Sequence, residues 1–120
     1  MNYLSIEPFI PSGPDFDKSK QLFQELGFKI EWDGGELVGF QNGSCKFILQ
    51  KYDNKAFAEN LMLSVKVSDI SEFWENISTK NLPEKFGIPS IRNPKEQPYG
   101  KEVNIIDIAG VCWHFIEELH

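Results

Sequence analysis

Two cysteines and a histidine at strand spacing are the clearest candidates for chemistry in this sequence. Cys112 and His114 are separated by one residue, and Cys45 lies in an earlier segment of similar sequence. Residues two apart on a strand point to the same face of a sheet, and thiolates and imidazoles are usual ligands of Zn²⁺. Strand parity assigns these side chains, and Glu7 with them, to one face. A zinc site of Glu7, Cys45, Cys112 and His114 is therefore one hypothesis.

The same residues also have a structural interpretation that involves no metal. Cysteine is frequently a small core residue, and a single histidine on a strand is typically half-buried with its ring hydrogen-bonded. The sequence has no Gly-rich phosphate loop, no Gly-x-Ser-x-Gly motif and no His-Glu-x-x-His motif, so the chemistries of those motifs are not indicated. We therefore predict no catalytic residue, no metal and no cofactor, and keep zinc binding as the alternative.

The composition indicates one globular domain over residues 1–120. Hydrophobic residues make up 41% and charged residues 25%, which is ordinary for a folded protein. The formal charge of -6 argues against a nucleic-acid partner, since such proteins must neutralise phosphates. No apolar run reaches the ~20 residues that a membrane-spanning helix needs, and the N-terminus lacks a basic and apolar leader. We expect a cytoplasmic protein whose two cysteines stay reduced.

Hydrophobic period predicts the same order of elements in each half of the chain. In the first half, a strand at 3–10 precedes a helix that Asp15 or Asp17 can cap and that ends near Gly27. In the second half, an alternating strand at 61–67 precedes a helix that begins at the capping box Asp69–Glu72. Further short strands complete the halves, at 28–32, 36–41, 45–51, 101–107 and 111–117.

This repeated order predicts an α+β fold of two tandem β-α-β-β-β modules. Residues 43–50 align without a gap with residues 110–117, which supports an internal duplication. We expect module one at about 1–52 and module two at about 60–120, joined in a single curved mixed sheet with the helices outside. Such a sheet surrounds a concave cavity, and concave cavities are the usual sites of small ligands.

Five short motifs in a fixed order connect the sequence to a known family. They are Asp15-Phe16-Asp17-Lys18-Ser19, Leu26-Gly27-Phe28, Val67-Ser68-Asp69-Ile70, Gln97-Pro98-Tyr99-Gly100 and Asp107-Ile108-Ala109-Gly110. In this order and spacing the sequence resembles the vicinal-oxygen-chelate superfamily of glyoxalases, bleomycin resistance proteins and dioxygenases, and within it the bleomycin-resistance-like branch. The resemblance spans nearly the whole chain. It implies the same paired β-α-β-β-β fold, in a homodimer whose chains together complete the cavity.

The resemblance also implies where a metal would bind. Enzymes of the superfamily hold a divalent metal with His and Glu side chains at four strand positions. Here these positions fall on Glu7 (Pro8 if the gap is placed differently), Phe47, Met62 and His114, so at most two retain a metal-ligating side chain. The resemblance therefore favours a metal-independent binding protein over an enzyme. The alternative is a metal-dependent lyase or dioxygenase-type enzyme with an altered site, such as the zinc site above.

Aromatic residues make up 13% of the chain, and some of them lie where the resemblance implies ligand contacts. Bleomycin resistance proteins stack the flat rings of the drug on aromatic side chains in a groove at the dimer interface, and an acidic surface attracts its cationic tail. Trp32 and Tyr99 fall at aromatic positions of that branch, and a stacked ring adds ~0.5 to 1.5 kcal/mol beyond area burial. The predicted ligand-binding residues are Trp32, Phe40, Phe47, Met62, Tyr99 and His114.

These observations together predict a dimeric small-molecule binding protein that sequesters a planar or cationic compound, bleomycin-like or otherwise. Its role would be antibiotic resistance or the handling of an unrelated metabolite, because a fold does not fix a function. No nucleic-acid or membrane partner is expected. A third hypothesis is a structural module whose cavity is filled by its own side chains, with Phe47, Leu49 and Met62 pointing inward.

Overall fold

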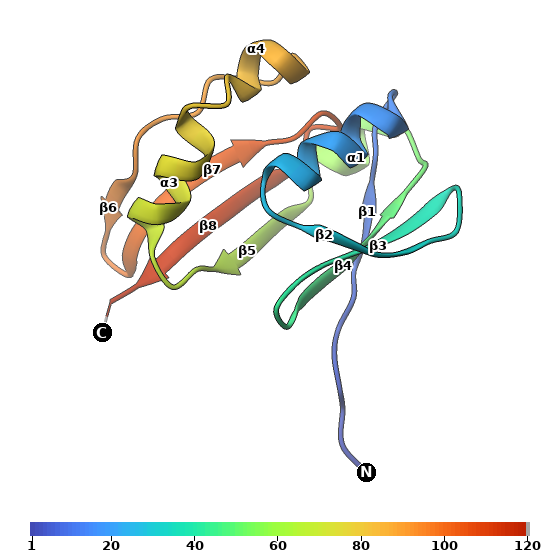
Figure 1. Cartoon of the computed structure of the whole chain (residues 1–120), viewed down its shortest axis with the longest axis horizontal. Coiled ribbons are helices and arrows are strands. Elements are labelled where there is room, and N and C mark those ends of the chain that lie inside the picture. Colours follow the sequence, from blue (N-terminus) through green and yellow to red (C-terminus); the bar gives the residue numbers. More distant parts are fainter. Residues whose placement is uncertain (120) are drawn as a thin grey trace.

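The computed structural model describes residues 1–119, and its elements form two similar sets (Figure 1). The first set comprises β1 (Phe9–Pro11), α1 (Phe16–Glu25), β2 (Lys29–Asp33), β3 (Leu37–Asn42) and β4 (Cys45–Gln50). The short helix α2 (Lys55–Glu59) connects it to the second set, which comprises β5 (Met62–Lys66), α3 (Ile70–Ser78), α4 (Leu82–Phe86), β6 (Lys95–Gln97), β7 (Gly100–Ile106) and β8 (Cys112–Glu118). The sequence periodicity did not predict three of these elements, the helices α2 and α4 and the strand β6.

Each set folds into one four-stranded mixed sheet. The strand order is β1-β4-β3-β2 in the first sheet and β5-β8-β7-β6 in the second. In each sheet the first strand pairs in parallel with the last, and the other neighbours are antiparallel. The predicted α+β fold of two β-α-β-β-β modules is thus confirmed. Within residues 1–119, however, no strand of one sheet pairs with a strand of the other, so the expectation of a single continuous sheet is wrong.

The N-terminal strand is much shorter than the predicted 3–10. Its ladder with β4 begins where Ile48 donates its N–H to the carbonyl oxygen of Pro8 at 2.8 Å, and Pro8 itself has no N–H to donate. Residues 1–8 run away from the body of the molecule as an extended arm (Figure 1). The side chains of Tyr3, Leu4 and Ile6 in this arm are largely exposed.

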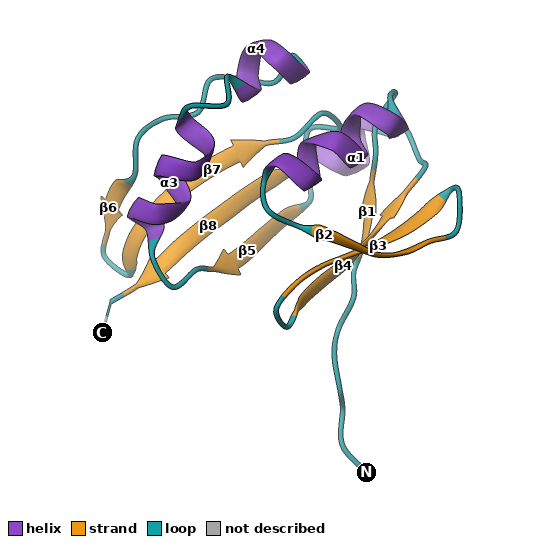
Figure 2. Cartoon of the chain, in the orientation of Figure 1, coloured by secondary structure: helices purple, strands orange, loops and turns teal. Residues whose placement is uncertain are grey.

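The two longer helices begin where the sequence predicts caps. Asp15 accepts a hydrogen bond from the N–H of Lys18 at the start of α1, and Asp69 accepts one from the N–H of Glu72 at the start of α3. Gly27 follows α1 with a positive φ of 103°, which a glycine adopts without strain. Helices α1, α3 and α4 lie on one side of the strands in Figure 2. None of the helices in residues 1–119 is long and apolar enough to cross a membrane.

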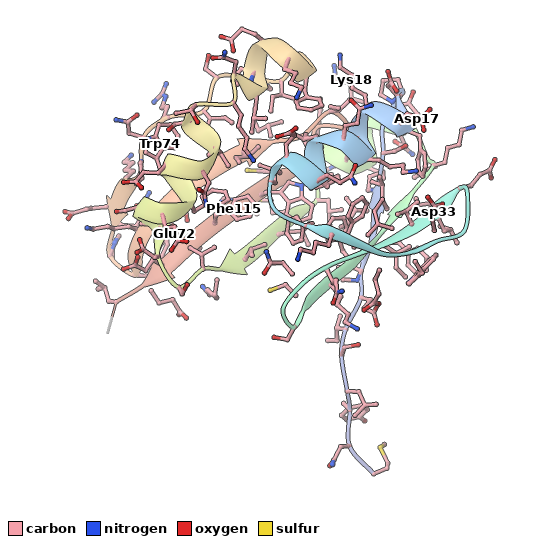
Figure 3. The ribbon with its side chains drawn as sticks, viewed as in Figure 1. Asp17, Lys18, Asp33, Glu72, Trp74 and Phe115 are labelled. Atoms are coloured by element: carbon pink, nitrogen blue, oxygen red, sulfur yellow. The ribbon has the colours of Figure 1, made fainter. Side chains whose placement is uncertain are left out.

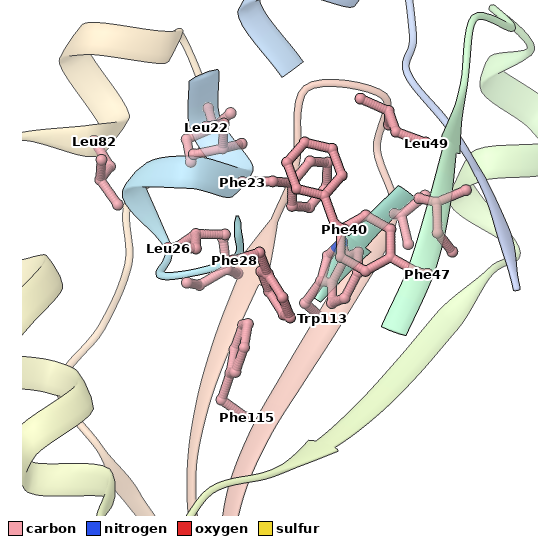
Figure 4. Packing of buried hydrophobic residues seen from close by; sticks show 14 of the residues in the cluster. Leu22, Phe23, Leu26, Phe28, Phe40, Phe47, Leu49, Leu82, Trp113 and Phe115 are labelled. Carbon is pink, nitrogen blue, oxygen red and sulfur yellow. The ribbon is translucent and has the colours of Figure 1, made fainter. Parts of the chain in front are cut away.

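An aromatic core joins the two sets of elements (Figure 4). The ring of Phe23 from α1 lies 4.9 Å from Phe47 of β4 and 5.2 Å from Trp113 of β8. Phe47 and Trp113 also contact each other, with ring centroids 5.1 Å apart. The indole N–H of Trp113 donates to Asp107 at 2.9 Å, so its burial leaves no polar group unpaired. Side chains therefore hold the two sheets together where backbone pairing does not.

Candidate ligand-binding surface

Strand register defines the face of the second sheet that no helix covers. Trp113 packs on Phe23 of α1, and the ring centroid of Phe115 lies 4.4 Å from that of Phe73 of α3, so both residues point to the helix side. Figure 3 labels Phe115 next to α3. Cys112 and His114 alternate with them and therefore point to the opposite face. We refer to this opposite face of β5, β8 and β7 as the helix-free face of the second sheet.

Three rows of side chains cross this helix-free face. The first row is apolar around a thiol, the second is polar, and the third carries opposite charges at its ends. In the order β5, β8, β7, the rows are Met62–Cys112–Ile106, Ser64–His114–Asn104 and Lys66–Ile116–Glu102.

A chain of polar contacts runs along these rows. The hydroxyl of Tyr99 donates to Glu102 Oε1 at 2.6 Å. The other oxygen of Glu102, Oε2, lies 3.3 Å from His114 Nδ1, and His114 Nε2 lies 3.5 Å from Cys112 Sγ. Glu102 is only 5% exposed, so its carboxylate is held in place by groups on this face.

The electrostatics of the chain follow from burial and hydrogen bonding. Burial alone would raise the pKa of Glu102, but hydrogen bonds from Tyr99 and His114 outweigh it and hold that pKa below its ordinary value. Glu102 is therefore a carboxylate near neutral pH and can only accept, which assigns a proton to His114 Nδ1. In the tautomer with its proton on Nδ1, the other ring nitrogen, Nε2, is the one that can accept from Cys112. Burial, followed by the carboxylates of Glu102 and Asp107, raises the pKa of the Cys112 thiol.

The first sheet has its own helix-free face, on which an indole lies across a glycine. Phe9, Ile48, Gly39 and Trp32 form one row across β1, β4, β3 and β2. A β-carbon added to Gly39 would occupy the space of the Trp32 ring. The ring of Trp32 thus lies flat against the sheet with 38% of the residue exposed, which is a geometry suited to stacking.

Four of the six predicted ligand-binding residues lie on these helix-free faces or at their margin. Trp32 is on the first sheet. Met62, which is 67% exposed, and His114, which is half-buried, are on the second sheet, and Tyr99 contacts it through Glu102. The structure therefore links Tyr99 to His114 through Glu102 and places Met62 in the row next to that of His114. Trp32 lies on the other sheet.

Phe40 and Phe47 require a correction, because they belong to the core. Phe40 is 1% exposed and Phe47 is 3% exposed. Their rings stack with centroids 5.2 Å apart, and both rings contact Phe23 of α1. The alternation of β3 and β4 explains this placement, since Gly39 and Ile48 take the helix-free face and leave Phe40 and Phe47 on the other. Neither phenylalanine presents a free ring for stacking.

The four residues of the hypothetical zinc site are not gathered in one place. Cys45 has the parity of Phe47 and therefore points to the helix side of its sheet, away from the face that carries Cys112 and His114. Glu7 lies on the N-terminal arm and accepts a hydrogen bond from Ser5 at 2.9 Å. In residues 1–119 no group of three His, Cys, Asp or Glu side chains could hold a metal ion. The four-residue zinc site is therefore not formed here.

Glu102 is the functional candidate that the sequence analysis missed. It is a buried acidic residue of β7, between the exposed Lys101 and the buried Val103. In the sequence Glu102 has the parity of Asn104, opposite to that of Val103 and Ile105, so no pattern marked it as buried. Its partners Tyr99 and His114 complete the polar chain.

Two clefts adjoin these elements. One of about 340 Å³ lies between β4 and β5 and is lined by Ile6 and Pro8 of the arm together with Leu63, Ser64 and Val65. Ser64 is the neighbour of His114 in the register, so this cleft opens beside the second helix-free face. The other, of about 540 Å³, lies on the helix side near α3.

Comparison with solved structures identifies the fold. A bleomycin-binding protein in complex with bleomycin matches with a TM-score of 0.79 and 21% identity, over 96% of this chain and 98% of that chain. A bleomycin-binding protein from bleomycin-producing Streptomyces verticillus, in complex with copper(II)-bleomycin, matches with a TM-score of 0.77 and 18% identity over 99% of both chains. A fosfomycin resistance protein from Listeria monocytogenes matches with a TM-score of 0.73 and 9% identity, over 99% of this chain and 94% of that chain.

No family model matches the chain, and no curated protein matches its sequence. The structural matches nevertheless cover almost the whole chain, so it has the paired β-α-β-β-β fold of the vicinal-oxygen-chelate proteins. Two of these three matches are bleomycin-binding proteins. The resemblance seen in the sequence is thus confirmed at the level of the fold.

Proposed function

We propose that this protein is a small-molecule binding protein that sequesters a planar, cationic compound on its helix-free faces without a metal. The observation that carries the proposal is the exposed indole of Trp32 lying across Gly39. A flat ring held against a sheet offers a stacking surface, and little ordering entropy is lost when a planar ligand covers it.

Charge supports the cationic part of the proposal. The chain has a formal charge of -6, and the buried carboxylate of Glu102 lies on the helix-free face of the second sheet. An acidic protein attracts cations and repels anions at long range. The fold of bleomycin-binding proteins makes bleomycin the first compound to test, and sequestration of such a drug would give antibiotic resistance.

We also propose that the binding form is a homodimer. The arm at residues 1–8 exposes Tyr3, Leu4 and Ile6, and only one of its carbonyl oxygens joins the ladder with β4. Exposed apolar side chains on an unpaired extended backbone are suited to pairing with another chain. A partner chain packed on the arm would also shield the cleft that Ile6 and Pro8 line.

A cytoplasmic location fits the same proposal. Cys45 and Cys112 are both free thiols in the structure, as expected in a reducing compartment.

Thermal unfolding in the presence of a matched set of compounds tests the binding function. The set contains bleomycin, a planar cationic dye, a planar anionic dye of similar size and the non-planar cation spermidine. A ligand at about 100 times its Kd stabilises the folded protein by about 2.7 kcal/mol, which raises the Tm by several degrees. We expect the planar cations to raise the Tm and the anion and spermidine to leave it unchanged. Equal shifts with the anion, or no shift with any planar cation, would contradict the proposal.

A further inference from the structure

The contacts of Cys112 have the geometry of a nucleophilic thiol beside a base. Its Sγ lies 3.5 Å from His114 Nε2, within the reach of a sulfur hydrogen bond. The other ring nitrogen, Nδ1, lies 3.3 Å from the carboxylate of Glu102. A nucleophile beside a base, with the base oriented by a third group, is the usual signature of nucleophilic catalysis.

The third group is itself rigidly held. Glu102 is 5% exposed, and its second oxygen accepts the hydroxyl of Tyr99 at 2.6 Å. This pair of contacts fixes the carboxylate on both oxygens, so it can hold His114 in the tautomer that leaves Nε2 free to accept a proton. Tyr99 and Glu102 therefore act through His114 and do not reach the thiol themselves.

The surroundings of the thiol define what can reach it. Met62 and Ile106 flank Cys112 on the neighbouring strands, and both are exposed. The next row places Ser64 and Asn104 on either side of His114, where they can hydrogen-bond a polar group of a bound molecule. An uncharged molecule with an apolar body and one carbonyl group fits this pattern of rows.

We propose that Cys112 is a nucleophile that captures small, uncharged α,β-unsaturated carbonyl compounds, with His114 as its general base and Glu102 as a positioning residue. Sγ forms a bond to the β-carbon while the electron pair of the C=C bond moves to the α-carbon and its carbonyl. The thiol proton passes to Nε2 of His114 and then to the α-carbon, which leaves a neutral thioether. The addition needs no oxidant, reductant or leaving group. It goes beyond reversible binding and does not depend on it.

The alternative is that Cys112 reacts as an unassisted thiol, without a base. The effect of replacing Glu102 on the reaction rate distinguishes this alternative from the proposal. Burial and the carboxylates of Glu102 and Asp107 raise the pKa of Cys112, so removing the charge of Glu102 would increase the thiolate fraction and speed an unassisted reaction. If Glu102 instead orients His114, the same substitution slows the reaction. The sign of the change therefore distinguishes a positioning residue from a simple electrostatic neighbour.

The test uses N-ethylmaleimide and intact-mass spectrometry near neutral pH. Cys45→Ser leaves Cys112 as the single thiol, and Cys112→Ser leaves the exposed Cys45 as the matched control. In the first background we expect His114→Ala to slow modification by at least ~10-fold and Glu102→Gln to slow it measurably. The same two substitutions leave the rate at Cys45 unchanged.

Chemical rescue makes the test independent of small changes in packing. Free imidazole should restore much of the rate to His114→Gly in the Cys45→Ser background, because it supplies the missing base, and should have no effect on the Cys45 control. The proposal is overturned if His114→Ala reacts as fast as the parent, if Glu102→Gln reacts faster, or if imidazole restores nothing to a folded His114→Gly protein.

Discussion

The indole of Trp32 lies across the backbone of Gly39 on the neighbouring strand, in space that a β-carbon at position 39 would occupy. The exposed stacking surface of the first sheet therefore depends on a residue without a side chain. Substituting either residue should change the surface while leaving the helix side of the sheet intact.

Gly39→Ala should displace the ring of Trp32 and weaken binding of a planar ligand. The added methyl group should also cost about 1–3 kcal/mol of stability, as overpacking usually does. Calorimetric titration with bleomycin and urea unfolding measure the two effects. Gly35→Ala is a matched control for the added methyl group, because a β-carbon there meets no other atom, although its positive φ of 89° adds strain. Undiminished binding by Gly39→Ala would show that the position of Trp32 does not matter.

Phe23→Ala should destabilise both modules together, because its ring contacts Phe47 of the first and Trp113 of the second. Loss of a fully buried phenylalanine costs about 3–5 kcal/mol. Urea unfolding should show one cooperative transition shifted to lower denaturant, whereas Phe57→Ala at an exposed position should change little. Two separate transitions in the variant would mean that the modules do not share a core.

The stability contributed by Glu102 should depend on pH in a defined direction. Its pKa in the folded protein is below the ordinary value of 4.5, so the folded state favours the carboxylate. The stabilisation is complete above the ordinary pKa and is lost as the pH falls through the lower, folded pKa. The difference in unfolding free energy between the wild type and Glu102→Gln should therefore be constant near neutral pH and shrink below about pH 4.5. If the difference in unfolding free energy grew as the pH fell, Glu102 would not be stabilised as a carboxylate in the folded protein.

Removing the arm at residues 1–7 should convert the proposed dimer into a monomer. The arm exposes apolar side chains and makes few contacts with its own body, so its loss should hardly change the unfolding free energy at low protein concentration. Light scattering after size-exclusion chromatography gives the mass of each form. Replacing Leu4 and Ile6 by Ser is the milder version of the test. If full-length protein is already a monomer at the highest concentration, the dimer proposal is wrong.

Much of the fold could be predicted because local signals agreed with the final packing. Asp15 and Asp69 cap the two longer helices as expected, and the strand predicted at 61–67 alternates between exposed and partly buried residues as predicted. The five-residue helices α2 and α4 are too short to display a hydrophobic period. Their start signals, the cap Asn54 and the first-turn Pro83, are therefore hard to distinguish from turn residues.

The faces of the strands were harder to predict than the strands themselves. The ungapped alignment of residues 43–50 with residues 110–117 makes Phe47 equivalent to His114. In the structure, however, Phe47 points to the helix side and His114 to the helix-free face. A shift of one residue exchanges the two faces of a strand, and similarity of sequence does not fix parity. This shift accounts for the wrong placement of Cys45 and Phe47, whereas Phe40 lies outside the aligned segment. The contact of Glu102 with His114 depended on the pairing of β7 with β8, which no local pattern encodes.

An equilibrium titration of bleomycin, followed by tryptophan emission, tests the central claim most directly. The wild type is compared with Trp32→Phe and with the control Trp74→Phe, whose site lies on α3 on the helix side (Figure 3). The account predicts a saturable change in emission for the wild type and Trp74→Phe, and a largely lost change with weaker binding for Trp32→Phe. A flat signal with the wild type up to high micromolar drug, or an equal response from Trp32→Phe, would contradict binding of this drug on the surface of Trp32.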